Sequence, residues 1–406
     1  MRRYSTEASS ATYTRFWPLL GLLFLLLGLA GCAPGEGIFS GGSWQAGSLQ
    51  DQHLHVLSVD PNNLLHLYAG DASSGVFVST DAGISWKPSS TGLPIPVAIY
   101  ALSFDPPGKT LYAATEAGLF ASSDFAGHWH AIDGLPADSY TTLAFNVDSP
   151  QTLYVGSTHS GVWKSSNAGA DWTDISKGLP ARTEITSLLY DANSKHLWAG
   201  FADALYRSPD DGGSWQSTSN GLPANAGVNA LAVGDITNTT SSLLFAGTNH
   251  GFFRSTDDGQ HWAPSQASLA ALHIRAILLD GLQPSVVYVS TDIGVLRSSD
   301  NGQNWSQIAS GLPASEQPIE GLVQGGDSYS QLFVASHGIY RYPGSGSPFD
   351  PSRLIPIVII LLFFALLYRF SLVRRRRLRQ LESELDGPPA ENVGDAASTQ
   401  TDSTAH

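Results

Sequence analysis

The chain of 406 residues has one cysteine, and charged residues make up only 14% of it. A single cysteine, Cys32, cannot form a disulfide within the chain, so the fold must be stable without one. Basic residues are also scarce, with 21 lysines and arginines against 35 aspartates and glutamates. Nucleic acid requires a basic surface, and this balance argues against it. We therefore expect no nucleic-acid partner.

Hydrophobic residues, in contrast, make up 42% of the chain, and there are 41 glycines. This is enough apolar side chain for a large core, and the glycines suit a fold with many tight turns. One apolar run, residues 16–30, follows a segment with three arginines and leads into Leu-Ala-Gly-Cys at residues 29–32. That order is typical of a secretory signal peptide, which we expect to be residues 1–31.

The end of this run resembles the lipobox of bacterial lipoproteins, in which a cysteine directly follows Leu-Ala-Gly. The resemblance implies that Cys32 becomes the new N-terminus and carries a lipid. An apolar segment that stays uncleaved as an N-terminal anchor is the alternative.

A second apolar run, residues 354–373, is long enough to span a bilayer, which takes about 20 residues. Four consecutive arginines follow it, and arginine beside a span marks the cytoplasmic side. We expect a linker at 344–353, a transmembrane helix at 354–373, and a basic and then disordered cytoplasmic tail at 374–406. The residues between the two runs would then lie outside a bacterial cell membrane.

A motif of eight residues recurs six times between these runs. Its copies are STDAGISW (79–86), SSDFAGHW (122–129), SSNAGADW (165–172), SPDDGGSW (208–215), STDDGQHW (255–262) and SSDNGQNW (298–305). Successive motif tryptophans are 43, 43, 43, 47 and 43 residues apart. Three strand-like runs precede each motif and one follows it. Each period therefore predicts a four-stranded antiparallel sheet, and radial stacking of such sheets gives a β-propeller.

The pattern Ser-x-Asp-x-Gly-x-x-Trp resembles the Asp-box, or BNR repeat. Propellers with this repeat include sialidases, family 74 xyloglucanases, sortilin-type receptor domains and photosystem II assembly factors. Two copies depart from the pattern, because Asn167 replaces the aspartate and Ala126 replaces the glycine. Catalysis needs one asymmetric arrangement of groups rather than six copies, so we interpret the motif as structural. Its key positions are Asp81, Trp86, Asp124, Trp129, Asn167, Trp172, Asp210, Trp215, Asp257, Trp262, Asp300 and Trp305.

Six complete motifs predict six blades, and the two ends of the repeat region supply a seventh. Residues 318–342 contain three further strand-like runs but no tryptophan, whereas Trp44 lies 42 residues before Trp86. The first strand should therefore complete the last blade, which removes open sheet edges. We predict an all-β, seven-bladed propeller over residues 36–343, closed by an N-terminal strand. In such a ring both chain ends leave from the face that carries the motifs, so we expect that face to look toward the membrane.

Sialidase chemistry needs three arginines around a carboxylate. Four of the arginines share one register just before the motif with Lys164, and we expect them to form a solvated framework stripe: Arg207, Arg254, Arg297 and Arg341. Only Arg182 and Arg275 remain, which argues against a sialidase.

Glycoside hydrolysis needs two facing carboxylates. Glu184, Asp203, Asp292 and Glu320 are possible acids, but nothing in the sequence pairs them. The turns between second and third strands hold a ring of polar residues: Asp71, Glu116, His159, Asp203, His250, Asp292 and His337. Seven-fold placement sets them too far apart for one metal ion. We therefore expect no metal and no cofactor.

One register near the start of each first strand carries a polar residue that varies from blade to blade. It reads His55, Tyr100, Thr141, Thr186, Asn229, Arg275 and Glu320, beside a nearly uniform leucine column. A framework does not need this variety, so we predict a ligand site at the outward mouth of the central channel. A solvated channel lining is the alternative.

These observations favour a non-enzymatic, membrane-anchored extracellular scaffold for binding or assembly. Photosystem II assembly factors are the nearest analogue in architecture, and fold alone does not transfer a partner. We expect a protein, peptide or glycan ligand on the outward face. A glycan-binding or xyloglucanase-like surface protein is the alternative.

Overall fold

The computed structural model describes residues 43–234, 242–308, 311–312, 318–326 and 331–343. The expected signal peptide, Cys32, the linker, the span at 354–373 and the tail lie outside the described residues. Within the described ranges, no helix combines the length and apolar character needed to cross a membrane.

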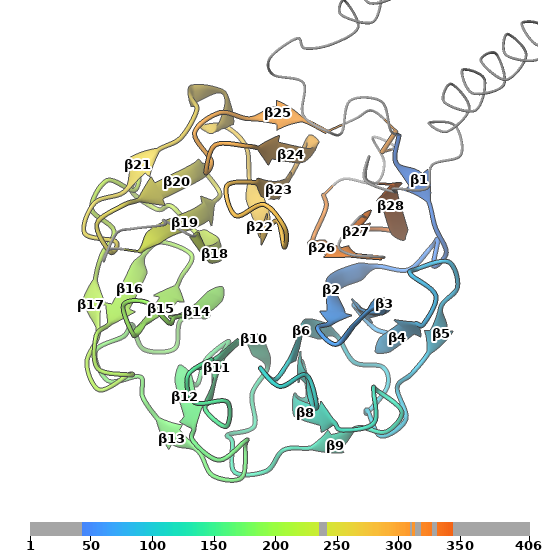
Figure 1. Cartoon of the computed structure of the whole chain (residues 1–406). Coiled ribbons are helices and arrows are strands. Elements are labelled where there is room, and N and C mark those ends of the chain that lie inside the picture. The colour runs from blue at the N-terminus through green and yellow to red at the C-terminus, as the bar shows by residue number, and fades with distance from the viewer. Residues whose placement is uncertain (1–42, 235–241, 309–310, 313–317, 327–330, 344–406) are drawn as a thin grey trace, which may run out of the picture. The chain divides into compact units, whose positions relative to one another are not determined.

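The described residues form seven four-stranded antiparallel sheets arranged around a common axis, as predicted (Figure 1). In six of the sheets the innermost strand comes first in the chain, and in all seven the outermost strand is only two residues long. The first four blades are β2 (Leu54–Asp60), β3 (Asn63–Asp71), β4 (Val76–Ser79) and β5 (Lys87–Pro88); β6 (Ile99–Phe104), β7 (Leu111–Thr115), β8 (Gly118–Ser122) and β9 (His130–Ala131); β10 (Tyr140–Phe145), β11 (Leu153–Ser157), β12 (Val162–Ser165) and β13 (Thr173–Asp174); β14 (Ser187–Asp191), β15 (His196–Gly200), β16 (Leu205–Ser208) and β17 (Gln216–Ser217).

The remaining blades follow the same order. They are β18 (Val228–Gly234), β19 (Leu243–Thr248), β20 (Gly251–Ser255) and β21 (Ala263–Pro264); β22 (Ile274–Leu279), β23 (Val287–Thr291), β24 (Gly294–Ser298) and β25 (Ser306–Gln307); β26 (Gly321–Gly325), β27 (Gln331–Ala335), β28 (Ile339–Pro343) and β1 (Gln45–Ala46). A short 3-10 helix, η1 (Ala267–Leu269), takes the place of a Gly-Leu-Pro connection before β22.

The first strand completes the last blade, as the split motif predicted. β1 pairs with β28 through Gln45 opposite Arg341 and Ala46 opposite Tyr340. Trp44 is 4% exposed, and its ring centroid lies 5.3 Å from that of Tyr342. Trp44 thus fills the position that the motif tryptophan has in the other blades.

The core lies between blades. The second strand of each blade carries a buried aromatic side chain at the same register. These residues are Tyr68, Tyr112, Tyr154, Trp198, Phe245, Tyr288 and Phe333. The Tyr112 hydroxyl donates to the Ala168 carbonyl at 3.2 Å, and Ala168 belongs to the motif of the next blade. Each such ring buries a large apolar area, so this column holds neighbouring blades together. In six blades this residue stands 17 or 18 positions before the motif tryptophan, a signal that the sequence analysis missed.

Candidate functional site

The six motif turns share one hydrogen-bond pattern. In each, the first serine donates to the aspartate or asparagine two positions later, at 2.7–2.9 Å. The same acceptor oxygen receives the backbone N–H four residues beyond it, at 2.7–2.9 Å. The serine oxygen in turn accepts the N–H of the glycine position at 2.7–2.9 Å. The polar groups that could react are therefore occupied within the turn itself.

These bonds explain why the motif is no catalytic triad. Asp257 accepts both the Ser255 hydroxyl, at 2.8 Å, and the Nδ1 of His261, at 2.7 Å. A nucleophilic serine needs a histidine between itself and the acid, whereas here the acid stands in the middle. In the first turn, hydrogen bonds from the hydroxyl and N–H of Ser85 lower the pKa of Asp81 to about 2. That aspartate is a charged acceptor that fixes the turn.

The glycine of the motif packs against the preceding blade. A Cβ atom at Gly259 would lie 2.2 Å from the Trp198 ring, and its φ is +73°. The two departures from the motif keep the turn, because Asn167 accepts the same bonds through its Oδ1 and Ala126 adopts a φ of +66°. The twelve motif positions therefore have the contacts of a structural element.

The basic residues of the third strands lie between blades, and the prediction of a solvated stripe was wrong. Arg297 is 8% exposed. Arg207 donates to the Asp258 carbonyl at 2.8 Å, and Lys164 forms an ion pair with Asp211. Both acceptors belong to the motif turn of the next blade. The register faces a neighbouring sheet, so these cations act as framework and not as clamps for a substrate carboxylate.

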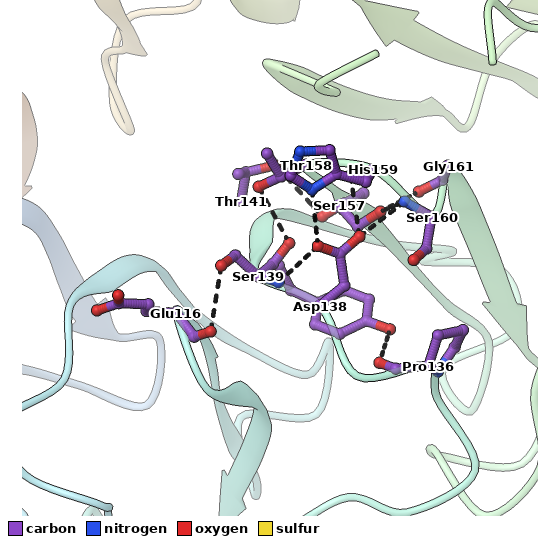
Figure 2. Close-up of polar contacts among 12 residues, drawn as sticks. Glu116, Pro136, Asp138, Ser139, Thr141, Ser157, Thr158, His159, Ser160 and Gly161 are labelled. Carbon is purple, nitrogen blue, oxygen red and sulfur yellow. Dashed lines mark hydrogen bonds and ion pairs between the residues drawn. The ribbon is translucent and has the colours of Figure 1, made fainter. Parts of the chain in front are cut away.

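Two of the turns between second and third strands use their polar residues in local hydrogen bonds. Asp138, in the loop before β10, accepts the N–H groups of His159 at 2.9 Å and Ser160 at 2.7 Å (Figure 2). Burial raises the pKa of Asp138, but hydrogen bonds from Ser160 and His159 outweigh it and bring the value to about 2. Asp71 likewise accepts N–H groups of its own turn. In the described part of the chain, no three histidine, cysteine or acidic side chains are placed to hold a metal ion.

A cavity of about 470 Å³ lies where the innermost strands begin, and all seven blades contribute to it. We call it the axial cavity. All seven residues of the varied register, which the sequence predicted to form a ligand site, line it together with three further residues. The lining is His55, Tyr100, Thr141, Glu184, Thr186, Asn229, Asn249, His273, Arg275 and Glu320. Arg182 and Asp203 are not among these residues.

On one side of the axial cavity, neutral side chains bond to the next blade. Thr141 donates to the Ile185 carbonyl at 2.6 Å, and Thr186 donates to the Val228 carbonyl at 2.7 Å. The amide nitrogen of Asn229 donates to the Ile274 carbonyl at 3.1 Å. These three bonds repeat from blade to blade, so part of the varied register has a structural use that the sequence analysis did not foresee.

The opposite side is charged. Arg275 Nη1 lies 3.1 Å from Glu320 Oε1, and its Nη2 lies 3.4 Å from Asp292 Oδ1. His273 Nδ1 stands 4.0 Å from the other oxygen of Asp292. Two of the four acids considered from sequence, Asp292 and Glu320, thus share one arginine. An arginine that already pairs with two carboxylates of the protein is poorly placed to bind the carboxylate of a ligand.

An aromatic pair completes the lining. The rings of His55 and Tyr100 stack with centroids 6.2 Å apart and planes 13° apart, and Tyr100 is 37% exposed. Burial raises the pKa of Tyr100, and the charges of Glu116 and Glu184 raise it further. Tyr100 therefore stays protonated, and the electrostatic potential beside it is negative.

Comparison with known proteins places this chain among β-propellers. Residues 40–234 match the family model described as the DUF6242 beta propeller domain. No curated protein sequence matches the chain.

Solved structures share the fold at low sequence identity. A family 74 xyloglucanase from Xanthomonas campestris is 18% identical with a TM-score of 0.59, over 77% of this chain and 55% of the enzyme. The extracellular domain of a putative one-component system from B. thetaiotaomicron is 18% identical with a TM-score of 0.60, over 74% of this chain and 40% of that domain. YCF48 bound to D1 peptide is 15% identical with a TM-score of 0.58, over 78% of this chain and 99% of YCF48.

The chain therefore spans about half of the xyloglucanase and less than half of the sensor domain, but nearly all of YCF48. At these identities the likeness shows the fold alone. The same fold occurs in enzymes and in binding proteins, so the function has to be argued from the axial cavity.

Proposed function

We propose that this protein is a membrane-anchored, extracytoplasmic scaffold that binds a protein or peptide ligand in the axial cavity without catalysis. One observation carries the proposal: the polar side chains that the seven blades give this cavity vary, with six residue types at seven positions, whereas the surrounding framework positions repeat. YCF48, which shares the fold over nearly its whole length, has been solved with a peptide bound. The membrane anchors rest on the sequence, namely the apolar runs 16–30 and 354–373 and the lipobox cysteine Cys32.

Co-purification tests this function. The full chain, extracted from bacterial membranes in mild detergent, is compared with a variant carrying His55→Ala and Tyr100→Ala, which removes the aromatic pair. We expect partners that co-purify with the wild type to be lost from this variant. Ile84→Ala is the matched control, because Ile84 is 66% exposed on a motif turn, away from the axial cavity. Equal recovery of all partners by the three proteins would contradict binding in the cavity.

A glycan ligand, bound or hydrolysed, is the second candidate. Glu184 and Glu320 both line the axial cavity, and two carboxylates around one cavity are the groups that glycoside hydrolysis requires. The fold shared with a xyloglucanase points the same way. Turnover of xyloglucan oligosaccharides that disappears in Glu184→Gln or Glu320→Gln would favour this candidate over the scaffold.

The direction in which the cavity faces is part of the proposal. The axial cavity lies on the face opposite the motif turns, so a motif face turned to the membrane would leave the cavity outward. Cysteines at Ile95 and Ile84 test this, because both side chains are exposed, at 48% and 66%, on opposite faces. With Cys32 as the only natural cysteine, we expect a bulky thiol reagent on intact cells to label Ile95→Cys faster than Ile84→Cys. Equal labelling would contradict the orientation.

A further inference from the structure

The charges around the axial cavity do not cancel. Arg275 is the one lysine or arginine among its lining residues, and Glu320 and Asp292 both contact it. Its positive charge is therefore already matched by two carboxylates. An anionic ligand would have to displace one of them, which would cost a charge-assisted hydrogen bond.

Two further carboxylates stand near the opposite side of the cavity. Glu184 lines it from the loop before β14, and Glu116 lies in the turn between β7 and β8, where Figure 2 shows it beside Ser139. Both side chains are exposed, and in the described part of the chain neither has a hydrogen bond or ion pair from its carboxylate. They act on the same phenol, because both raise the pKa of Tyr100. Among the residues that line this quadrant of the cavity there is no lysine or arginine.

Tyr100 adds an aromatic ring to this quadrant. A ring next to carboxylates is the combination that holds a protonated amine or a guanidinium, because the ring face is itself negative. The neutral side contributes less, since Thr141, Thr186 and Asn229 already donate to backbone carbonyls of the next blade. The unmatched groups of the cavity therefore favour a cation.

We propose that the axial cavity binds the cationic end of a lysine or arginine side chain of a partner peptide, between Glu184 and the ring of Tyr100. This inference rests on the proposed function and names the chemistry of its ligand. The partner would present a basic segment to an acidic cavity.

Calorimetric titration of the full chain in detergent tests this proposal. The probes are tetralysine, Nε-acetylated tetralysine, tetraglutamate and a tetramer of glucosamine. We expect tetralysine to bind and acetylation to abolish binding. Glu184→Gln should weaken the binding of tetralysine by about fivefold, which corresponds to one partly exposed ion pair. Tyr100→Leu should weaken this binding by about two- to fivefold. Raising the ionic strength should weaken binding of the wild type as well.

Asp133→Asn is the matched control, because Asp133 is an exposed acid on the same face that does not line the cavity. Circular dichroism checks that all variants are folded. The proposal would be overturned if tetralysine bound Glu184→Gln as tightly as wild type. It would also be overturned if Asp133→Asn weakened tetralysine binding as much as Glu184→Gln does, because the overall acidity of the surface would then explain the binding. Preference for tetraglutamate or for the glucosamine tetramer would also overturn it.

Failure of this inference is distinguishable from failure of the proposed function. If tetralysine does not bind, but partners still co-purify with the wild type and are lost without His55 and Tyr100, the cavity binds a ligand of another class. If no partner depends on His55 and Tyr100, the proposed function itself fails.

Discussion

The motif turns and the axial cavity use polar residues in opposite ways. Each motif turn repeats the same side chains, and its serine and acid bond to each other and to the backbone of the same turn. The axial cavity shows side chains that vary from blade to blade, and the carboxylate of its acid Glu184 has no such partner in the described residues. Repetition thus accompanies polar groups that bond within one turn. In the varied register, Thr141, Thr186 and Asn229 bond to the next blade, and Arg275 bonds to Glu320. The carboxylate that remains available to a ligand, that of Glu184, lines the cavity from outside this register.

The largest effect should come from the packing of a motif turn. Gly259→Ala places a Cβ against Trp198 and forces an alanine to a φ of +73°. Overpacking and the backbone penalty together should lower the free energy of unfolding by about 3–5 kcal/mol. Gly134→Ala is the matched control, because its φ is +86° but the nearest atom to a new Cβ lies 3.5 Å away. It should cost only about 1–2 kcal/mol. Urea unfolding measures both, and equal losses would refute the packing argument.

The acid of the motif should matter as an acceptor more than as a charge. Asp257→Ala leaves the Ser255 hydroxyl and the His261 N–H without their partner, which should cost about 1–2 kcal/mol. Asp257→Asn should cost less than about 1 kcal/mol, because Asn167 makes the same bonds in another blade. Thermal and urea unfolding of the two variants measure the difference. A larger loss for asparagine than for alanine would show that charge is the essential property.

The two sides of the axial cavity should respond differently to loss of a hydroxyl. Thr186→Val removes the bond to the Val228 carbonyl and should lower stability by about 1 kcal/mol. Tyr100→Phe should change stability by less than about 0.5 kcal/mol, because in the described residues no hydrogen bond from its hydroxyl is present. Urea unfolding compares the two variants. A larger loss for Tyr100→Phe would mean that the Tyr100 hydroxyl belongs to the framework as well.

The smallest effect concerns the charge of one motif acid. The pKa of Asp81 in the folded protein, about 2, lies below its ordinary value of 3.8. A depressed folded-state pKa stabilises the protein above the ordinary value, and this contribution is lost as pH falls from about 4 to about 2. Unfolding followed from pH 5 to pH 2 should therefore fall less steeply for Asp81→Asn than for wild type. Parallel profiles would mean that this carboxylate has no net role in acid stability.

The sequence was informative where one contact is repeated. The motif spacing predicted the blades, the split motif predicted that Trp44 and β1 complete blade seven, and the varied register predicted the lining of the axial cavity. Sequence reasoning failed where a side chain meets the next blade. The use of Thr186 depends on a carbonyl 42 residues away, and the burial of Arg297 depends on how neighbouring sheets pack. Glu184 and His273 were not recognised as lining because each stands two positions before the varied register, outside the column that the sequence analysis considered.

The closure of blade seven also sets an order of events during synthesis. Gln45 and Arg341, which face each other across β1 and β28, are separated by 296 residues. At a synthesis rate of about 5–20 residues per second, β28 is synthesised roughly 15–60 s after β1. Until then the ring has two unpaired sheet edges, the state in which strands of different molecules pair most readily. The last step of folding therefore joins the oldest strand of the ring to the newest, and a nascent chain is most in need of protection just before that step.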